Sequence, residues 1–172
     1  MKFVFALRAA ISFGVGIFIT FNQSHSAATG LLSLGIFGIG FALLNGIGSA
    51  VWGKRGFSPE NLPLTLGALA FGSVALFIPT GDLQAAALAF VFLVGGGGLV
   101  AGAFELYLAR RAGFSTRSGK DSLINAVLSL FLGLLFLIVP LDIVSAVGFF
   151  GAYLVLSGVH LGIAAVTPAK EL

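Results

Sequence analysis

Six long apolar stretches, separated by short polar segments, follow one another along the 172 residues. They cover residues 3–21, 26–52, 62–79, 83–109, 121–139 and 143–166. A helix needs roughly 20 apolar residues to cross a hydrocarbon core about 30 Å thick, and each stretch is close to or above that length. The pattern therefore predicts an all-α membrane protein, in which six transmembrane helices form a single domain over residues 1–172.

The composition supports this prediction because apolar residues predominate. Hydrophobic residues make up 58% of the chain and charged residues only 9%, against about 25% charged residues in soluble domains, and the mean hydropathy is +1.11. The absence of cysteine excludes disulfides, thiol nucleophiles and cysteine metal sites. The net charge of +3 is explained by basic residues that flank membrane spans. We therefore expect membrane lipids as partners and no nucleic acid.

The Lys and Arg residues occupy alternate flanks of the apolar stretches. In chain order they are Lys2, Arg8, Lys54, Arg55, Arg110, Arg111, Arg117, Lys120 and Lys170. The intervening segments 22–25, 80–82 and 141–142 contain none. Because short segments rich in Lys and Arg stay in the cytoplasm, we expect both termini to be cytoplasmic and these three turns to lie outside.

Two small residues four positions apart recur along the chain, and they divide it into three repeated helical hairpins. The hairpins cover residues 3–52, 62–109 and 121–166. The pairs on the first helices are Ala10/Gly14, Ala68/Gly72 and Ser129/Gly133, and those on the second helices are Ala42/Gly46, Gly98/Gly102 and Gly158/Gly162. Membrane helices pack closely through small residues, so the pairs predict a compact bundle with threefold pseudosymmetry. The run Gly95 to Gly98 is assigned to packing or a kink, since no Lys-Ser/Thr follows it.

The polar breaks contain residues that end one helix and begin the next. Asp82 and Asp142 follow prolines in the turns and are expected to cap the next helix. The segment Asn22-Gln23-Ser24 is expected to do the same without proline. Ser58-Pro59-Glu60 reads as the start of the third helix, and Ser118 with Asp121 as the start of the fifth.

The first apolar stretch also resembles a secretory signal, since Lys2 precedes it and Ser24-His25-Ser26 follows it. Arg8 interrupts the apolar region that such a signal requires. Residues 10–21 also match the first helix of the other hairpins. We therefore expect this segment to be retained as a helix.

Arg8, Glu105 and His160 are the candidate functional residues, because each breaks the repeated pattern. Arg8 lies roughly 20 Å from the outer end of its helix, at 1.5 Å per residue, so its side chain either extends to the inner headgroups or faces the bundle and binds a carboxylate, an anion or a headgroup. Glu105 is expected near the inner interface, paired with Arg110 and Arg111.

His160 falls within the small pair Gly158/Gly162. A hydrogen bond across a helix contact is one interpretation of this position, and a proton sensor or relay is the other. Asn45 and Asn125 are interpreted as interhelical hydrogen-bond partners. The chain shows no paired intramembrane carboxylates, no metal-ligand spacing and no serine beside a base. We therefore expect no enzymatic activity, no catalytic residue, no metal and no cofactor.

Several segments together resemble a known family. Leu7-Arg8-Ala9-Ala10 leads to Gly14, and residues 133–140 run from glycine to proline before Gly148, Gly151, Gly158 and Gly162. This pattern is similar to the short membrane repeat of HdeD-like proteins, which are small six-helix proteins of the bacterial inner membrane. The resemblance implies a role in acid resistance or the envelope stress response, without an established enzymatic activity, cofactor or site.

Two main functional hypotheses follow, and an intramembrane enzyme or an accessory subunit of one is a third. The first is a non-enzymatic integral membrane protein that supports acid or envelope stress resistance by binding lipid, a second copy of itself or another membrane protein. The second is a small proton-linked transporter or channel, for which Arg8, Glu105 and His160 would lie along a pathway. Polar residues that converge on a hydrated cavity would favour transport, whereas polar residues placed singly at helix contacts would favour the first hypothesis.

Overall fold

The computed structural model describes residues 2–52 and 61–167, which form six helices and no strand. The helices are α1 (Lys2–Phe21), α2 (Ala27–Trp52), α3 (Leu62–Phe77), α4 (Leu83–Ala112), α5 (Arg117–Ile138) and α6 (Ile143–Val166). Five of them are long and apolar enough to cross a membrane. The exception is α3, which has 16 residues because its helix ends at Phe77 and extended backbone begins at Ile78. The all-α prediction is confirmed, and most helix ends lie within a few residues of their expected positions.

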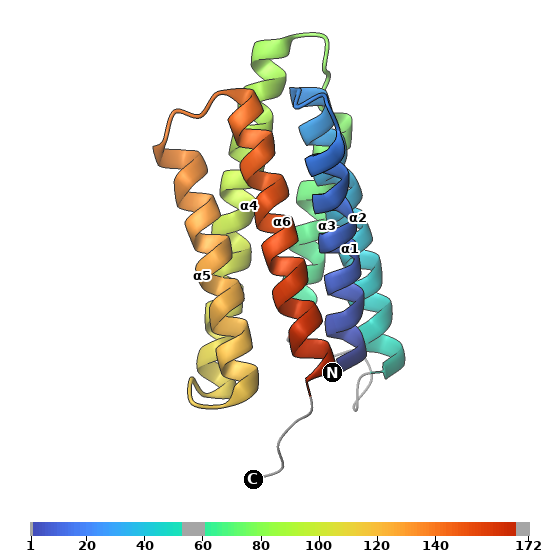
Figure 1. Cartoon of the computed structure of the whole chain (residues 1–172), viewed down its shortest axis with the longest axis vertical. Helices are drawn as coiled ribbons and strands as arrows, with labels where there is room; N and C mark the ends of the chain where they lie inside the picture. The colour runs from blue at the N-terminus through green and yellow to red at the C-terminus, as the bar shows by residue number, and fades with distance from the viewer. Residues whose placement is uncertain (1, 53–60, 168–172) are drawn as a thin grey trace.

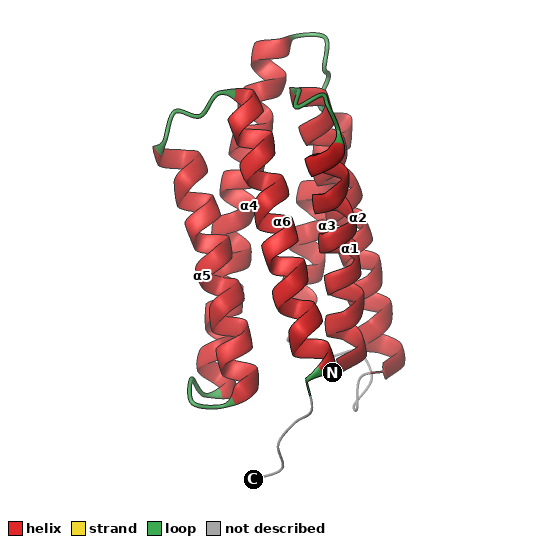
Figure 2. Ribbon diagram, viewed as in Figure 1, coloured by secondary structure: helices red, strands yellow, loops and turns green. Residues whose placement is uncertain are grey.

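The helices run up and down in an elongated bundle (Figures 1 and 2). The connections 22–26, 78–82 and 139–142 gather at one end of it. The connection 113–116 lies at the other end, with the start of α1 and the end of α6. The hairpin threading expected from the sequence is therefore present in the backbone, while the threefold repeat itself stays a prediction.

Two acidic residues begin helices as expected. The Asp82 carboxylate accepts hydrogen bonds from the backbone N–H groups of Gln84 and Ala85, at 3.0 and 3.1 Å. The Asp142 carboxylate accepts one from the backbone N–H of Ser145 at 3.0 Å. Each bond satisfies a donor that the first turn of a helix leaves free.

Two other expected helix starts, for α2 and α5, are wrong. Thr116 caps α5 by accepting a bond from the Gly119 N–H at 3.0 Å, so this helix begins before Ser118 and Asp121. Ser26 accepts from the Thr29 N–H at 3.2 Å, whereas Asn22 stabilises the turn by accepting from the Ser24 N–H. A short polar turn contains several hydroxyl or amide side chains that could cap the next helix. Their spacing in the sequence alone does not show which of them does so. Ser58-Pro59-Glu60, Lys54, Arg55 and Lys170 lie outside the described residues.

The closest helix packing occurs between successive hairpins rather than within them. The most extensive contacts join α4 to α5, α1 to α6 and α2 to α3, and those of α3 with α4 and of α5 with α6 are much smaller. The pair formed by α1 and α6 brings the first and last helices side by side (Figure 1). The bundle is thus a closed ring of three tight pairs.

Small residues allow each tight pair to approach at backbone distance. A Cβ on Gly98 of α4 would lie 2.9 Å from the Ser129 carbonyl oxygen and 3.0 Å from the Gly133 nitrogen of α5. A Cβ on Gly38 of α2 would lie 2.7 Å from the Gly72 Cα of α3. Real Cβ atoms do not approach so closely, so no side chain would fit at either position. The absence of one is what allows the two helices to pack at this distance.

On α1 the predicted pair Ala10/Gly14 is wrong. Gly14 is exposed, and a Cβ on it would meet no atom within 4 Å. The contact is made by Gly16, where a Cβ would lie 2.7 Å from the Val155 nitrogen of α6. Residues two positions apart differ by about 200° around a helix. Since small residues occur on both sides of α1, their spacing did not identify the packed face.

Candidate ion-pair site and central cavity

A cavity of about 100 Å³ lies inside the bundle and is lined by residues from all six helices. Most of its wall is apolar, with Leu34, Phe41, Leu132 and Phe150 among the lining residues. The polar lining residues are Arg8, Ser12, Glu105, Asn125, Ser129, Tyr153 and Ser157. The cavity therefore combines an apolar wall with charged and hydrogen-bonding groups.

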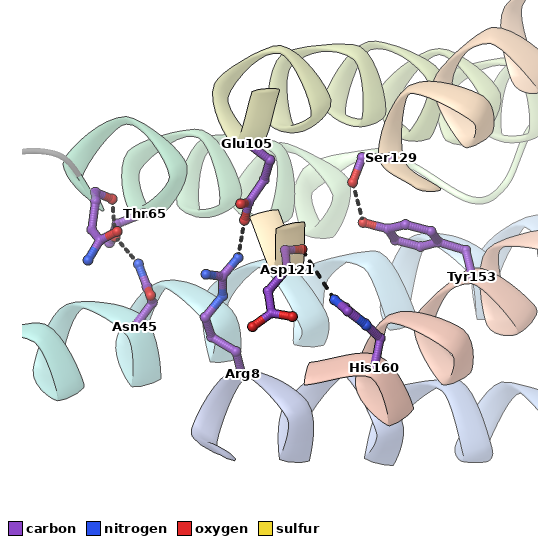
Figure 3. Close-up of polar contacts among 9 residues, drawn as sticks. Arg8, Asn45, Thr65, Glu105, Asp121, Ser129, Tyr153 and His160 are labelled. Carbon is purple, nitrogen blue, oxygen red and sulfur yellow. Dashed lines mark hydrogen bonds and ion pairs between the residues drawn. The ribbon is translucent and has the colours of Figure 1, made fainter. Parts of the chain in front are cut away.

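Arg8 and Glu105 form a buried ion pair on the wall of this cavity. The guanidinium of Arg8 on α1 donates to the carboxylate Oε1 of Glu105 on α4 (Figure 3). The exposed fractions of the two side chains are 8% and 4%. The guanidinium carbon also lies 5.0 Å from the centroid of the Phe41 ring, which is a cation–π distance. The pair thus links α1 and α4, which are far apart in the sequence.

These contacts decide between the interpretations of the two charged residues. Arg8 does not extend to the headgroups: its side chain faces the bundle and holds a carboxylate. Glu105 is not paired with Arg110 and Arg111, because those residues are exposed in the last turn of α4 whereas Glu105 faces inward. Both residues are buried in an apolar bundle, where each charge requires the other.

Two residues that line the cavity each have a buried side-chain atom with no hydrogen-bond partner among the described residues. These atoms are Nε of Arg8, which donates, and Oδ1 of Asn125, which accepts. Such atoms are uncommon in native structures, because an unpaired buried polar atom costs about 1–3 kcal/mol. The interhelical bond expected of Asn125 is therefore not made by its oxygen.

Tyr153 and Ser129 contribute a second polar contact that the sequence interpretation missed. The Tyr153 hydroxyl of α6 lies 2.9 Å from the Ser129 hydroxyl of α5 (Figure 3). The sequence analysis assigned Ser129 only to helix packing, whereas in the structure it both packs against α4 and forms a hydrogen bond with Tyr153. A tyrosine within a largely apolar helix was the available signal, since a buried phenol usually finds a hydrogen-bond partner.

His160 lies apart from the ion pair and does not line the cavity. Its Nε2 lies 3.2 Å from the backbone carbonyl oxygen of Asp121, so it bonds across the contact between α6 and α5 as expected (Figure 3). Asn45 likewise donates to the Thr65 hydroxyl at 2.8 Å across α2 and α3. The structure thus brings together two of the three candidate residues, Arg8 and Glu105, and leaves His160 at a helix contact.

The exposure of lining residues on α3 and α4 indicates that the cavity reaches the outside of the bundle between these helices. On these helices the lining residues include partly exposed Gly67, Phe71 and Ala101, as well as Val100, which is 44% exposed. The lining residues of α1 and α5 are buried. Contacts between α3 and α4 are few, as are those between α5 and α6, and the most exposed lining residue, Val100, lies on α4. The opening faces sideways, at the surface formed by apolar side chains.

Within residues 2–52 and 61–167, no three His, Asp or Glu side chains cluster in a way that could hold a metal ion. The functional groups available at the cavity are one carboxylate, one guanidinium, one amide and several hydroxyls. With the carboxylate held by the guanidinium, this set is suited to hydrogen bonding with a bound molecule rather than to nucleophilic attack.

Comparison of the chain with protein-family models, with curated proteins and with solved structures finds no match.

Proposed function

We propose that this chain is a non-enzymatic integral membrane protein that binds a lipid-like molecule between its helices and thereby supports acid or envelope stress resistance. It would cross the bacterial inner membrane with both termini in the cytoplasm. It would act by binding, either alone or with a second copy or another membrane protein. The observation that carries this proposal is the polar group of residues around Arg8 and Glu105, in an apolar cavity open to the side of the bundle.

The surface of the bundle supports a membrane location. Large apolar side chains are exposed on every helix, among them Phe18, Leu43, Phe77, Phe92 and Phe131. Such a surface would aggregate in water but is suited to contact with acyl chains.

The described charges outside the core are divided between the two ends of the bundle. Arg110, Arg111, Arg117 and Lys120 lie around the 113–116 connection together with one acidic residue, Asp121, whereas Asp82 and Asp142 lie at the opposite end. This distribution favours the end with the basic residues as the cytoplasmic one.

The cavity geometry favours binding over catalysis and over a transmembrane path. Its opening between α3 and α4 faces the position that acyl chains would occupy. A solute path usually requires several polar groups in succession across the membrane. Here the polar groups are gathered in one cavity, while Asn45 and His160 lie at separate helix contacts.

A proton-linked transporter or channel is the alternative, and one observation favours it. Glu105 is a carboxylate buried inside an apolar bundle, which is a common position for a proton-carrying group.

Flux measurements separate the two functions. The purified chain is reconstituted in liposomes, and proton and ion flux is measured from about pH 4 to 7, a range that spans carboxyl and imidazole titration. Our proposal predicts flux equal to that of empty liposomes, together with fatty-chain adducts in native mass spectrometry. Flux above that level that is abolished in Arg8→Ala or Glu105→Gln, with His160→Ala as the control, would support the transporter instead.

Orientation can be tested directly because the chain contains no cysteine. Gly81→Cys and Ser115→Cys place single thiols in connections at opposite ends of the bundle. A membrane-impermeant maleimide added to intact cells should label the first variant and not the second. The reverse labelling would show that the termini are outside.

A role in stress resistance is tested in a bacterial strain that lacks its own copy. Expression of the wild-type chain should raise survival after acid or envelope stress, and expression of Asn125→Leu or Arg8→Lys should raise it less. Equal survival with and without the chain would refute this part of the proposal.

A further inference from the structure

We infer that the cavity binds an uncharged single-chain amphiphile whose headgroup carries a hydroxyl that both donates and accepts hydrogen bonds. The molecule would enter from the membrane between α3 and α4. This inference rests on the proposed function, and it specifies the chemistry of the bound molecule. It is drawn from the charge, the unpaired atoms and the size of the cavity, in that order.

The charge balance of the cavity favours an uncharged headgroup. Arg8 already holds Glu105, so the two lining charges cancel. An anionic headgroup would bring a second negative charge beside Glu105, and a cationic one would bring a second positive charge beside Arg8. An uncompensated charge in an apolar cavity is strongly unfavourable. Carboxylates, phosphates and ammonium groups are therefore disfavoured.

The unpaired atoms specify the hydrogen bonding of the headgroup. Arg8 Nε is a donor that lacks an acceptor, and Asn125 Oδ1 is an acceptor that lacks a donor. Both residues line the cavity. A hydroxyl is the simplest group that can accept from a donor of the first kind and donate to an acceptor of the second kind. Alcohols and undissociated carboxylic acids have such a group, whereas ethers and esters can only accept.

The size and the position of the cavity specify the rest of the molecule. Its volume is about 100 Å³, which is less than the ~150 Å³ of an engineered apolar cavity that accommodates benzene. Only a small head and the first few carbons of a chain fit within it. The remaining carbons would leave past Phe71 and Ala101 and lie on the exposed apolar surface of α3 and α4. A phospholipid headgroup is too large for this position.

Matched ligands test the headgroup. The full chain is placed in phospholipid nanodiscs, and its Tm is measured with n-decanol and with decyl methyl ether at equal mole fractions. The ether accepts but cannot donate. We expect n-decanol at about ten times its Kd to raise the Tm by about 3–5 °C, and the ether to raise it by much less. Decanoic acid should act like n-decanol at about pH 5, where part of it is undissociated, and lose this effect at about pH 8.

Variants locate the effect in the cavity. Asn125→Leu removes the acceptor, Arg8→Lys removes the Nε donor but keeps the positive charge for Glu105, and Ala101→Phe fills the opening. Each should abolish the difference between n-decanol and the ether. The matched controls are Asn45→Leu, at a helix contact away from the cavity, and Ala103→Phe, on the exposed face of α4. Both controls should keep the difference. Circular dichroism at the start of each melt identifies variants that are not folded. The folded variants then show whether these residues cause the difference between n-decanol and the ether.

The outcomes distinguish this inference from the proposed function. Equal Tm shifts for n-decanol and the ether that are lost in Ala101→Phe would refute the headgroup assignment, as expected if water pairs with the two unpaired atoms, and would leave lipid binding intact. A difference that persists in Asn125→Leu and Arg8→Lys would refute the assignment of these residues. Tm shifts that are unchanged by Ala101→Phe, together with no lipid adduct in native mass spectrometry, would refute binding in the cavity altogether.

Discussion

The two faces of α4 use similar small residues for opposite purposes. On one face, Gly95, Gly98 and Gly102 lie against α5, and a Cβ on any of them would come within 3.0 Å of an α5 atom. On the other face, Gly97 and Ala101 line the cavity, and a Cβ on Gly97 would meet only the Phe71 ring, at 3.5 Å. The first face thus packs directly against α5, with Gly98 also at the edge of the cavity, and the second leaves room.

This difference shows that small residues in a membrane helix have two separate physical effects. Where a partner backbone moves into the space, they allow close packing of two helices. Where no partner fills it, they leave a cavity. The run Gly95 to Gly98 contains both cases within one turn of the helix, and Glu105 extends the cavity face by two turns.

Breaking the ion pair on the cavity face should produce the largest effect. Glu105→Gln leaves the Arg8 charge buried and uncompensated, and we expect it to lower the free energy of unfolding by about 3–5 kcal/mol. The measurement is SDS titration in mixed micelles, monitored by circular dichroism.

The control for this substitution is Asp121→Asn. Its carboxylate lies 3.9 Å from Arg117, whose side chain is 40% exposed, so we expect a change below about 1 kcal/mol. The double variant Arg8→Met with Glu105→Leu should be more stable than Glu105→Gln, since both charges are gone. Equal effects of Glu105→Gln and Asp121→Asn would show that the pair is solvated.

Alanine substitutions at adjacent glycines test the two faces directly. Gly98→Ala forces the backbones of α4 and α5 apart, so we expect a loss of about 1–3 kcal/mol. Gly97→Ala adds a methyl group at an ordinary contact distance from Phe71 and improves helix propensity, so we expect no loss and a gain of up to about 1 kcal/mol. The same titration measures both, and similar losses would remove the distinction between the faces.

Much of the fold could be predicted because the signals are local and repeated. Apolar length gave the six helices, and acidic residues after proline gave the starts of α4 and α6. The packed face of α1 could not be predicted. Small residues at positions 9, 10, 12, 14 and 16 surround that helix, and only the position of α6 selects among them. Pairing between successive hairpins is likewise a property of the closed ring rather than of any segment.

The two charged residues of the candidate site could be predicted from the sequence, but their arrangement and the other polar residues around them could not. Arg8 and Glu105 stood out because they break the pattern, yet the sequence placed Glu105 beside the nearby Arg110 and Arg111. Their contact spans 97 positions and depends on how α1 and α4 face each other. Asn125 and Tyr153 carried no charge to mark them, and their role depends on a cavity that local pattern does not reveal.

Hydrogen bonds on the cavity wall should contribute less than those between tightly packed helices. Tyr153→Phe removes the hydroxyl that bonds Ser129 beside the cavity, and we expect a loss of about 0.6 kcal/mol or less. Thr65→Val removes the hydroxyl that accepts from Asn45 and donates to the Asn61 carbonyl, so a loss of about 1 kcal/mol is expected. A larger loss for Tyr153→Phe would show that the cavity wall is as rigid as the tight pairs.

The smallest expected effect is the contribution of Asp142 to the acid sensitivity of the fold. This contribution has to be measured before any acid sensitivity is attributed to the cavity face of α4. Hydrogen bonds from the Ser145 side chain and backbone lower the pKa of the Asp142 carboxyl in the turn before α6. Asp142 therefore stabilises the fold above its unfolded pKa of about 3.9, and this contribution is lost as the pH falls through the lower folded value. Asp142→Asn keeps a capping oxygen but cannot titrate, so it should flatten the stability profile slightly in that acidic range and leave it unchanged near neutral pH. Unfolding titrations across that range measure this. Acid sensitivity that remains in Asp142→Asn but disappears in the double variant Arg8→Met with Glu105→Leu would belong to the cavity face of α4, whereas a profile identical to that of the wild type would show that the cap does not contribute.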